Sequence, residues 1–227
     1  MTGPRILKVL AIDIGGSHVK TMCSPRSERR EFASGEGLTA GQMVAETLAL
    51  TSDWQYDVIS IGYPGPVVHD HPFAEPRNLG KGWVGFDFNN AFKRPVKIVN
   101  DAAMQALGSY AGGRMLFLGL GTGLGSAMIV DGLLEPMELA HLEYKHGHTY
   151  EDYVGLRGLE WLGKKKWRAA VGDVVTQLSA ALEPDYVVIG GGNAKELKKL
   201  PKNSRRGDNR NAFAGGFRLW EAARRRG

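Results

Sequence analysis

Two aspartates stand where apolar runs of the sequence end. Asp13 closes the run in "VLAIDIGGS", and Asp101 follows the run in "VKIVNDAAMQALG". A carboxylate within hydrogen-bond reach of a hydroxyl can take its proton while that hydroxyl attacks a phosphoryl group. A carboxylate can also hold Mg²⁺ through water. We therefore interpret Asp101 as a candidate general base and Asp13 as a candidate magnesium ligand; the alternative for Asn100 and Asp101 is simple helix capping.

Three glycine-rich segments follow apolar runs, and glycine lets a backbone approach an anion with its N–H groups exposed. They are Gly15–Gly16, the run Gly121–Thr122–Gly123, and "VVIGGGN" at 187–193. The first segment alone is explained better by a β-hairpin turn. A second such turn, however, suggests two lobes that face one phosphate chain. None of the segments matches GxGxxG or GxxxxGK[ST], which disfavours nicotinamide chemistry and P-loop hydrolysis.

These residues require strands that end near one another and helices that follow them. The apolar patterns predict the following order of elements: a helix at 39–50, a strand at 56–67, a long loop to about Phe88, a strand at 95–100, a helix at 101–110, a glycine hairpin at 114–130, a helix at 165–183, a strand at 185–193 and a helix near 211–223. Alternation of strands and helices predicts an α/β fold. We expect two lobes, residues 1–110 and 111–227, divided by the small residues of "LGSYAGG".

Composition narrows the classes of protein. The 227 residues are 43% hydrophobic, and glycines interrupt every long apolar stretch, so we expect no membrane span. The N-terminal apolar run is typical of a buried strand and lacks a signal-peptide cleavage site. It therefore predicts a cytoplasmic protein. The single cysteine, Cys23, excludes an intrachain disulfide and a cysteine-rich zinc site.

The net charge of +5 is unevenly distributed, since many cations follow Trp161, including Arg224–Arg226 at the end. Such runs usually form a solvated surface. The other interpretation is a binding surface for a polyanionic ligand.

The quoted segments, together with "GYPGPV", "NLGKGW", "ELAH" and "EDY", stand in the order found in the ROK family of sugar kinases. That family is part of the actin-like ATPase superfamily, and the chain most closely resembles its branch of polyphosphate glucokinases. The match spans nearly the whole chain. The resemblance implies a two-lobed actin-like (ribonuclease H-like) α/β fold with mixed sheets. It also implies transfer of a phosphoryl group from polyphosphate, ATP or both to the 6-hydroxyl of glucose or a related hexose.

The resemblance also implies roles for single residues. Asp101 matches the general base, and Asp13 would serve Mg²⁺. The donor's phosphates would be contacted by Gly15, Gly16, Ser17, Gly121, Thr122, Gly123 and Gly191. The sugar would be bound by Gly65, Asn78, Asn100, Asp101, Glu138, His141 and Glu151.

The sequence departs from the family's pattern in three places. Ala140 replaces the usual glycine of the E-x-G-H motif, and His18 stands where small residues are usual. The segment after His141 has no cysteine, so we expect no structural zinc, and His146 and His148 are expected to be solvated. The alternatives are an ATP-only hexokinase of other specificity and a catalytically silent sugar sensor. Because only a short leader precedes Asp13, we expect no DNA-reading module. Dimers are common in the family, so a homodimer is an expectation.

Overall fold

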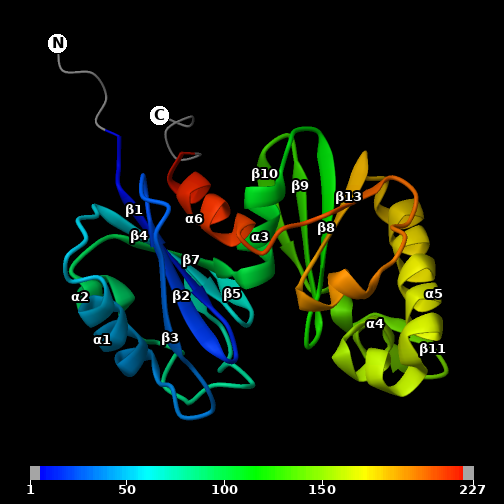
Figure 1. The fold of residues 1–227 in the computed structure, drawn as a ribbon, viewed down its shortest axis with the longest axis horizontal. Helices are drawn as coiled ribbons and strands as arrows, with labels where there is room; N and C mark the ends of the chain where they lie inside the picture. The colour runs from blue at the N-terminus through cyan, green and yellow to red at the C-terminus, as the bar shows by residue number, and fades with distance from the viewer. Residues whose placement is uncertain (1–5, 222–227) are drawn as a thin grey trace. The chain divides into compact units, whose positions relative to one another are not determined.

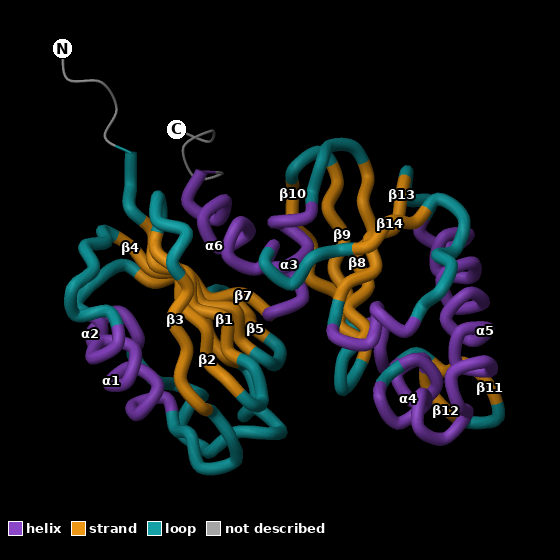
Figure 2. Tube along the Cα trace, viewed as in Figure 1, coloured by secondary structure: helices purple, strands orange, loops and turns teal. Residues whose placement is uncertain are grey.

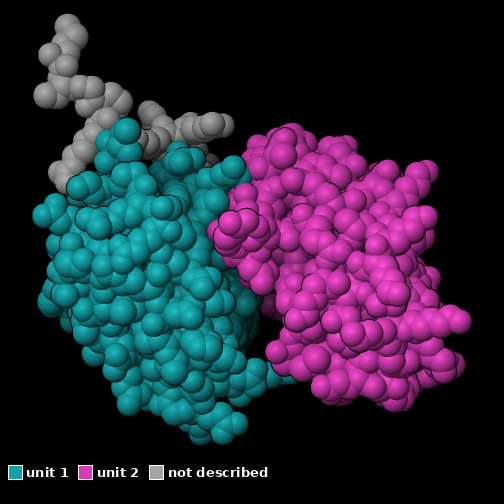
Figure 3. Space-filling model, in the orientation of Figure 1, with its two compact units in different colours: residues 1–104, 212–227 teal, residues 105–211 magenta. Residues whose placement is uncertain are grey.

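The computed structural model describes residues 6–221, which form two compact units (Figure 3). The first unit extends to Met104 and takes up the chain again from Ala212, whereas the second runs from Gln105 to Asn211. The compact units therefore group the chain differently from the expected lobes 1–110 and 111–227, because the closing helix packs on the first unit's sheet. The predicted basic end, Arg224–Arg226, lies outside the described residues.

The first unit is built on a five-stranded mixed sheet with the strand order β3-β2-β1-β4-β7. Its strands are β1 (Val9–Ile14), β2 (His18–Cys23), β3 (Arg29–Ala33), β4 (Val58–Tyr63) and β7 (Val96–Asn100). β1, β4 and β7 are parallel neighbours, and β2 and β3 continue the sheet in antiparallel hairpins. β2 was implied only by the hairpin interpretation of Gly15–Gly16, and β3 was not predicted, because its alternating polar residues give no continuous apolar run.

Helices cover both faces of this sheet (Figures 1 and 2). One face, with Leu10 and Ile12, packs against α1 (Ala40–Leu50) and α2 (Phe88–Phe92) in one buried cluster. A capping box starts α1, since the Thr39 hydroxyl accepts a hydrogen bond from the Gln42 N–H at 3.3 Å and the Gln42 side chain accepts one from the Thr39 N–H at 2.9 Å.

The other face receives α3 (Asp101–Ser109) and α6 (Asn211–Glu221). α6 approaches closely because Gly216 has no side chain; a Cβ there would lie 2.7 Å from the Ala11 Cβ. The buried Ser60 hydroxyl donates to the Gly216 carbonyl at 2.6 Å and accepts from the Trp220 Nε1–H at 3.0 Å. These contacts attach the end of the described chain to the first sheet.

The second unit contains a mixed sheet with the order β10-β9-β8-β13-β14. Its strands are β8 (Arg114–Leu120), β9 (Leu124–Val130), β10 (Leu133–Met137), β13 (Tyr186–Gly190) and β14 (Ser204–Arg206). β8 and β9 form the predicted glycine hairpin, and β13 is parallel to both β8 and β14. With two mixed sheets and helices packed on them, the predicted α/β class is confirmed.

Shorter elements complete the two units. They are the hairpin of β5 (Val67–Val68) and β6 (His71–Pro72), the 3₁₀ turns η1 (Leu139–His141) and η2 (Gly192–Glu196), the hairpin of β11 (Glu143–Lys145) and β12 (His148–Thr149), and the helices α4 (Tyr150–Val154) and α5 (Leu156–Leu182). α5 starts earlier than the predicted helix at 165–183 and is interrupted at Gly163, where φ is 69°. No helix within residues 6–221 has the length and apolar character to cross a membrane.

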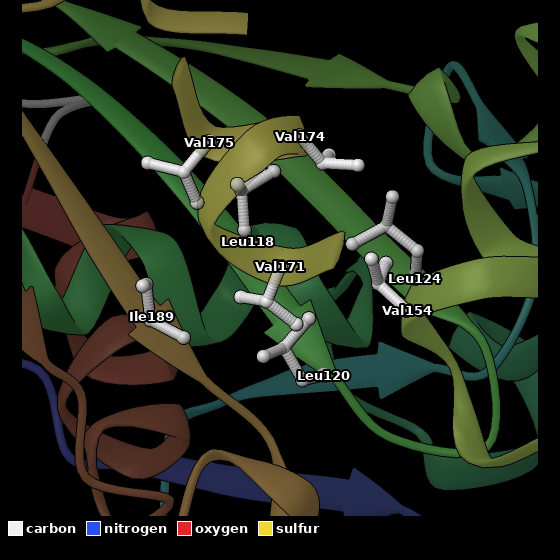
Figure 4. A pocket seen from close by; sticks show the side chains of 8 residues that line it. All are labelled: Leu118, Leu120, Leu124, Val154, Val171, Val174, Val175 and Ile189. Carbon is white, nitrogen blue, oxygen red and sulfur yellow. The ribbon is translucent and has the colours of Figure 1, made fainter. Parts of the chain in front are cut away.

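The core of the second unit lies between α5 and its sheet. Figure 4 shows eight apolar side chains that surround one internal space there: Leu118, Leu120, Leu124, Val154, Val171, Val174, Val175 and Ile189. All eight are aliphatic and offer no hydrogen-bonding side-chain group to a sugar or a phosphate. This space is therefore part of the packed core.

Candidate active site

The predicted site residues divide into a group in each unit. In the first unit they follow the carboxyl ends of the parallel strands β1, β4 and β7, which meet at one edge of the sheet. Asp13 pairs with Gly62 in register, and Gly62 pairs with Val99. Ligands of open α/β sheets bind at such an edge. The fold thus brings Asp13, Gly65 and Asn100–Asp101 to one end of the sheet.

Asp13 is half-buried at the end of β1. Desolvation raises its pKa above the usual 3.8, and the Lys20 ammonium opposes that rise. Lys20 lies directly across the β1–β2 ladder from Asp13. Because directly opposed residues share one face of a sheet, the two side chains act on each other without an intervening strand.

The turn Gly15–Ser17 joins β1 to β2, so the hairpin interpretation of this segment is confirmed. The Gly15 N–H donates to the His18 carbonyl at 3.0 Å and is used within the turn. Ser34 holds the turn from outside: its N–H donates to the Ser17 carbonyl at 2.9 Å, and its hydroxyl donates to the Gly15 carbonyl at 2.6 Å. Gly16 and Ser17 are exposed. Any anion contact from backbone N–H groups of this turn therefore falls to Gly16 and Ser17.

Two predicted sugar-loop residues adjoin this edge. Asn78 lies against the turn, because a Cβ placed on Gly16 would be 3.6 Å from the Asn78 Cβ. The Gly65 carbonyl accepts a hydrogen bond from Asn100 Nδ2 at 3.1 Å. The structure therefore connects the loops after β1, β4 and β7 through side chains that the sequence analysis had singled out.

Asn100 and Asp101 begin α3. The Asn100 Oδ1 accepts from the N–H groups of Ala102 at 2.9 Å and Ala103 at 3.3 Å, so Asn100 caps the helix. Asp101 Oδ1 also accepts from the Ala102 N–H, at 2.7 Å. A Cβ on Gly62 would lie 3.5 Å from the Asp101 Cα, so the absence of a side chain at Gly62 allows α3 to start close to β4.

In the second unit, the turn Gly121–Gly123 between β8 and β9 collects contacts from three other segments. Asn193 Nδ2 donates to the Gly121 carbonyl at 2.8 Å, and the Leu156 N–H donates to the Thr122 carbonyl at 3.1 Å. Glu151 Oε2 accepts from the Leu124 N–H at 3.3 Å. A Cβ on Gly123 would overlap the Glu151 carboxylate. Glu151, predicted to bind sugar, thus lies beside the turn predicted to bind phosphate.

Gly191 also reaches this region. A Cβ there would overlap the Leu120 backbone, and φ at Gly191 is 83°, a conformation that favours glycine. The chain after β13 consequently passes directly beside the start of the Gly121–Gly123 turn.

Glu138 and His141 lie at the two ends of the η1 turn, and both are exposed. The Ser126 hydroxyl fixes the entry to this turn, since it donates to the Met137 carbonyl at 2.8 Å and accepts from the Leu139 N–H at 3.1 Å. Ala140, which replaces a glycine of the family pattern, is 2% exposed and packs in the second unit's core. The extra methyl group is therefore accommodated by burial.

His146 and Gly147 form the turn between β11 and β12, with φ values of 55° and 75°. His148 Nδ1 lies 3.7 Å from Asp152 Oδ2. Among residues 6–221 no group of three or more histidine, cysteine, aspartate and glutamate side chains is arranged to hold a metal ion.

Sequence analysis missed three residues that contact or face these site residues: Lys20, Ser34 and Asn193. Asn193 ends the segment "VVIGGGN" but was given no role there, and Lys20 and Ser34 were given none either. Their contacts are side-chain bonds to backbone groups or to a carboxylate on another segment, and such pairs have no recurrent spacing in a sequence.

The chain was compared with families, sequences and solved structures of known proteins. No family model matches the chain. The structure of an inorganic polyphosphate/ATP-glucomannokinase from Arthrobacter sp. superposes with a TM-score of 0.81 at 23% identity, over 96% of this chain and 99% of that one. A ROK family glucokinase from Streptomyces griseus, in complex with glucose and AMPPNP, gives a TM-score of 0.75 at 15% identity, over 93% of this chain and 98% of that one. The fold is that of the ROK sugar kinases, with the actin-like ATPase architecture.

A sequence relative sharpens the resemblance. Polyphosphate glucokinase of Mycobacterium tuberculosis is 30% identical over 157 residues, which cover 62% of this chain and 58% of the relative. The predicted resemblance to ROK sugar kinases, and among them to polyphosphate glucokinases, is confirmed. The matched part of this chain spans less than two thirds of the relative's length.

Proposed function

We propose that the protein is a sugar kinase that transfers a phosphoryl group from polyphosphate, ATP or both to the 6-hydroxyl of glucose. One observation carries the proposal: Asp13, the exposed turn at Gly16–Ser17, Asn78 and Asp101 all lie at the carboxyl edge of β1, β4 and β7. Adjacent strands are about 4.8 Å apart, so the backbones at Asp13 and Val99 are separated by roughly 10 Å. That span suits a metal-bound phosphoryl group beside a sugar hydroxyl.

In this mechanism Asp101 accepts the proton of the 6-hydroxyl. The hydroxyl oxygen forms a bond to the terminal phosphorus, and the bond from that phosphorus to the bridging oxygen breaks, with its electrons left on the departing phosphate. Asn100 orients the start of α3 because its Oδ1 caps the helix while its Nδ2 reaches Gly65. Catalysis then consists of positioning and proton removal, as phosphoryl transfer requires.

The sugar ligands proposed for the first unit are Gly65, Asn78 and Asn100. Those proposed for the second unit are Glu138, His141 and Glu151. Carboxylates, amides and imidazoles suit this task because sugar hydroxyls both donate and accept hydrogen bonds. The exposed side chains of Glu138 and His141 are accessible for such contacts.

Asp13 fits a magnesium ion. Mg²⁺ is commonly held by one or two carboxylates, with waters and substrate phosphates completing its ligands. A desolvated carboxyl with a raised pKa gains from a cation that compensates its charge. When bound, the ion would neutralise charge on the donor oxygens.

The donor's phosphates are proposed to contact the two glycine turns, at Gly16–Ser17 and at Gly121–Gly123, with Gly191 beside the second. A longer polyanion needs cations beyond these turns. Several cations predicted for that role are engaged internally: Lys164 pairs with Glu196 at 2.7 Å, and Arg168 donates to the Glu196 carbonyl. Six other lysines that follow Trp161 are exposed: Lys165, Lys166, Lys195, Lys198, Lys199 and Lys202.

Replacement of Asp101 tests the proposed base. Asp101→Asn should abolish glucose-dependent phosphorylation, measured as glucose 6-phosphate formed, while circular dichroism and the melting temperature stay near wild type. Turnover retained by this variant would reject Asp101 as the base. Glucose binding by the wild type without transfer from any donor would favour the sensor alternative.

Donor and sugar choice require a second assay on the wild type. ATP and long-chain polyphosphate are compared at fixed glucose, and glucose and mannose are compared at a fixed donor. We expect turnover with polyphosphate and glucose. Activity with ATP alone would support the ATP-only hexokinase instead. A cytoplasmic location remains part of the proposal.

A further inference from the structure

We infer that Glu75 is a positioning residue for the acceptor sugar: its carboxylate closes the loop 75–84 and thereby holds Asn78 in place beside the Gly16 turn. The inference rests on the proposed function, because it takes Asn78 as a sugar ligand. Glu75 acts through the loop backbone and is not itself proposed as a sugar ligand.

The geometry at Glu75 is a carboxylate bound by three consecutive backbone groups. The N–H of Gly82 donates to Oε1 at 3.2 Å, that of Trp83 to Oε2 at 3.1 Å, and that of Val84 to Oε1 at 3.3 Å. Successive N–H groups directed at one anion form a concave donor site. Here the anion is supplied by the chain itself, and the loop is closed by one side chain.

The N–H donors hold the charge of Glu75 in its ionised form. Burial of the carboxyl would raise its pKa, but the N–H groups of Trp83, Val84 and Gly82 and the nearby Lys81 lower it below 4.5. Glu75 is therefore ionised at neutral pH and can accept all three hydrogen bonds there. Hydrogen bonds to an ionised acceptor are stronger than neutral ones, so this carboxylate is a better closure than a hydroxyl or amide.

The closed loop is anchored on the first unit's core at two further points. Leu79 is 7% exposed and Trp83 is fully buried, with its ring 5.7 Å from that of Tyr63. Gly80 passes so close to the preceding segment that a Cβ would lie 2.9 Å from the Gly37 carbonyl oxygen. Its N–H donates to the Leu38 carbonyl at 3.0 Å.

Asn78 is an exposed residue between Glu75 and Leu79, next to Leu79 in the chain and against Gly16 in space. Leu79 and Gly80 fix the chain on one side of Asn78. On the other side, Glu75 is tied to 82–84. The Tyr63 hydroxyl also donates to the Ala74 carbonyl at 2.8 Å, next to Glu75. Loss of the Glu75 contacts would separate the segment 75–78 from 82–84, and an error of about 1 Å in a substrate ligand can cost up to about a hundredfold in rate.

Two variants at Glu75 and one control variant test the inference. Glu75→Ala removes the acceptor, Glu75→Gln keeps one carbonyl oxygen but loses the charge, and Glu46→Gln on the exposed face of α1 is the matched control. We expect the KM for glucose to rise about tenfold in Glu75→Ala and by a smaller factor in Glu75→Gln, with kcat changed less than threefold or so. The control should match the wild type.

Amide hydrogen exchange separates loop closure from activity. In Glu75→Ala, exchange should accelerate in a peptide that contains 82–84, while peptides of β1 and β4 keep wild-type protection. Faster exchange with an unchanged glucose KM would overturn the positioning role. Unchanged exchange would show that Glu75 does not close the loop. A wild type that phosphorylates no hexose would instead reject the proposed function, and the exchange comparison would still decide whether Glu75 closes the loop.

Discussion

Lys20 faces Asp13 directly across the β1–β2 ladder, and its ammonium is the cation that opposes the desolvation of that carboxyl. Metal binding needs the carboxylate, so the apparent affinity for Mg²⁺ should increase as the pH rises from about 3.8 through the raised pKa of Asp13. Lys20→Met removes the opposing charge. The pKa of Asp13 should then rise further, and the magnesium dependence should move to higher pH.

The measurement is activity against Mg²⁺ concentration at a series of pH values. The raised pKa has the opposite effect on folding, since native Asp13 binds its proton more tightly than the unfolded chain does, and stability falls as pH rises through that pKa. Lys8→Met, at an exposed position just before β1, is the control. Identical magnesium profiles for wild type and Lys20→Met would show that Lys20 does not tune Asp13.

Substitutions at two glycines of one turn distinguish the effect of moving the Glu151 side chain from the effect of altering the turn. A Cβ on Gly123 would overlap the Glu151 carboxylate, whereas a Cβ on Gly121 meets nothing within 4 Å. Gly123→Ala should therefore turn the Glu151 side chain away and lower kcat/KM for glucose at least about tenfold. Gly121→Ala should fold equally well and lose much less. Equal losses in the two variants would contradict this account.

Two fully buried tryptophans differ in one hydrogen bond. Trp167 Nε1 donates to the Val154 carbonyl at 3.0 Å, whereas Trp83 Nε1 has no partner among the described residues. Replacement by phenylalanine shortens both side chains, but only at Trp167 does it leave a carbonyl unpaired. Trp167→Phe should cost about 1–3 kcal/mol more in the free energy of unfolding than Trp83→Phe. The free energies of unfolding of the two variants are compared by urea titration, with amide hydrogen exchange as the probe within each unit. A larger cost for Trp83→Phe than for Trp167→Phe would refute the prediction.

The exposed lysines near η2 are predicted to act on polyphosphate more than on ATP. η2 carries Asn193, which holds the Gly121–Gly123 turn, so Lys195 and Lys198 lie close along the chain to the proposed donor site. The variant Lys195→Gln/Lys198→Gln should raise the KM for long-chain polyphosphate about tenfold at low salt and weaken its salt dependence. The KM for ATP should change less.

The control for that pair carries the same change of charge in the first unit, near the amino ends of two strands. Lys8→Gln/Lys93→Gln alters two exposed lysines near the amino ends of β1 and β7. A similar loss of polyphosphate affinity in this control would assign the effect to net charge. That result would reject a specific polyphosphate-binding role for Lys195 and Lys198.

Much of the site was predictable because it depends on local pattern. Apolar runs that end in an acid or in glycines identified β1, β7, β8 and β13, and with them Asp13, Asp101 and both hairpin turns. The order of the motifs predicted the ROK fold. Their roles as ligands and base stay predictions until the variants are measured.

The tertiary structure decided what depends on pairs of residues far apart in the chain. It attached α6 to the first sheet through Gly216 and Ser60, used the Gly15 N–H inside its own turn, and set Glu151 beside Gly123. It also bound Glu75 to the backbone of 82–84. A sequence records side-chain types and local periodicity, but a bond from a side chain to a distant backbone group exists only once folding has set the distance between them.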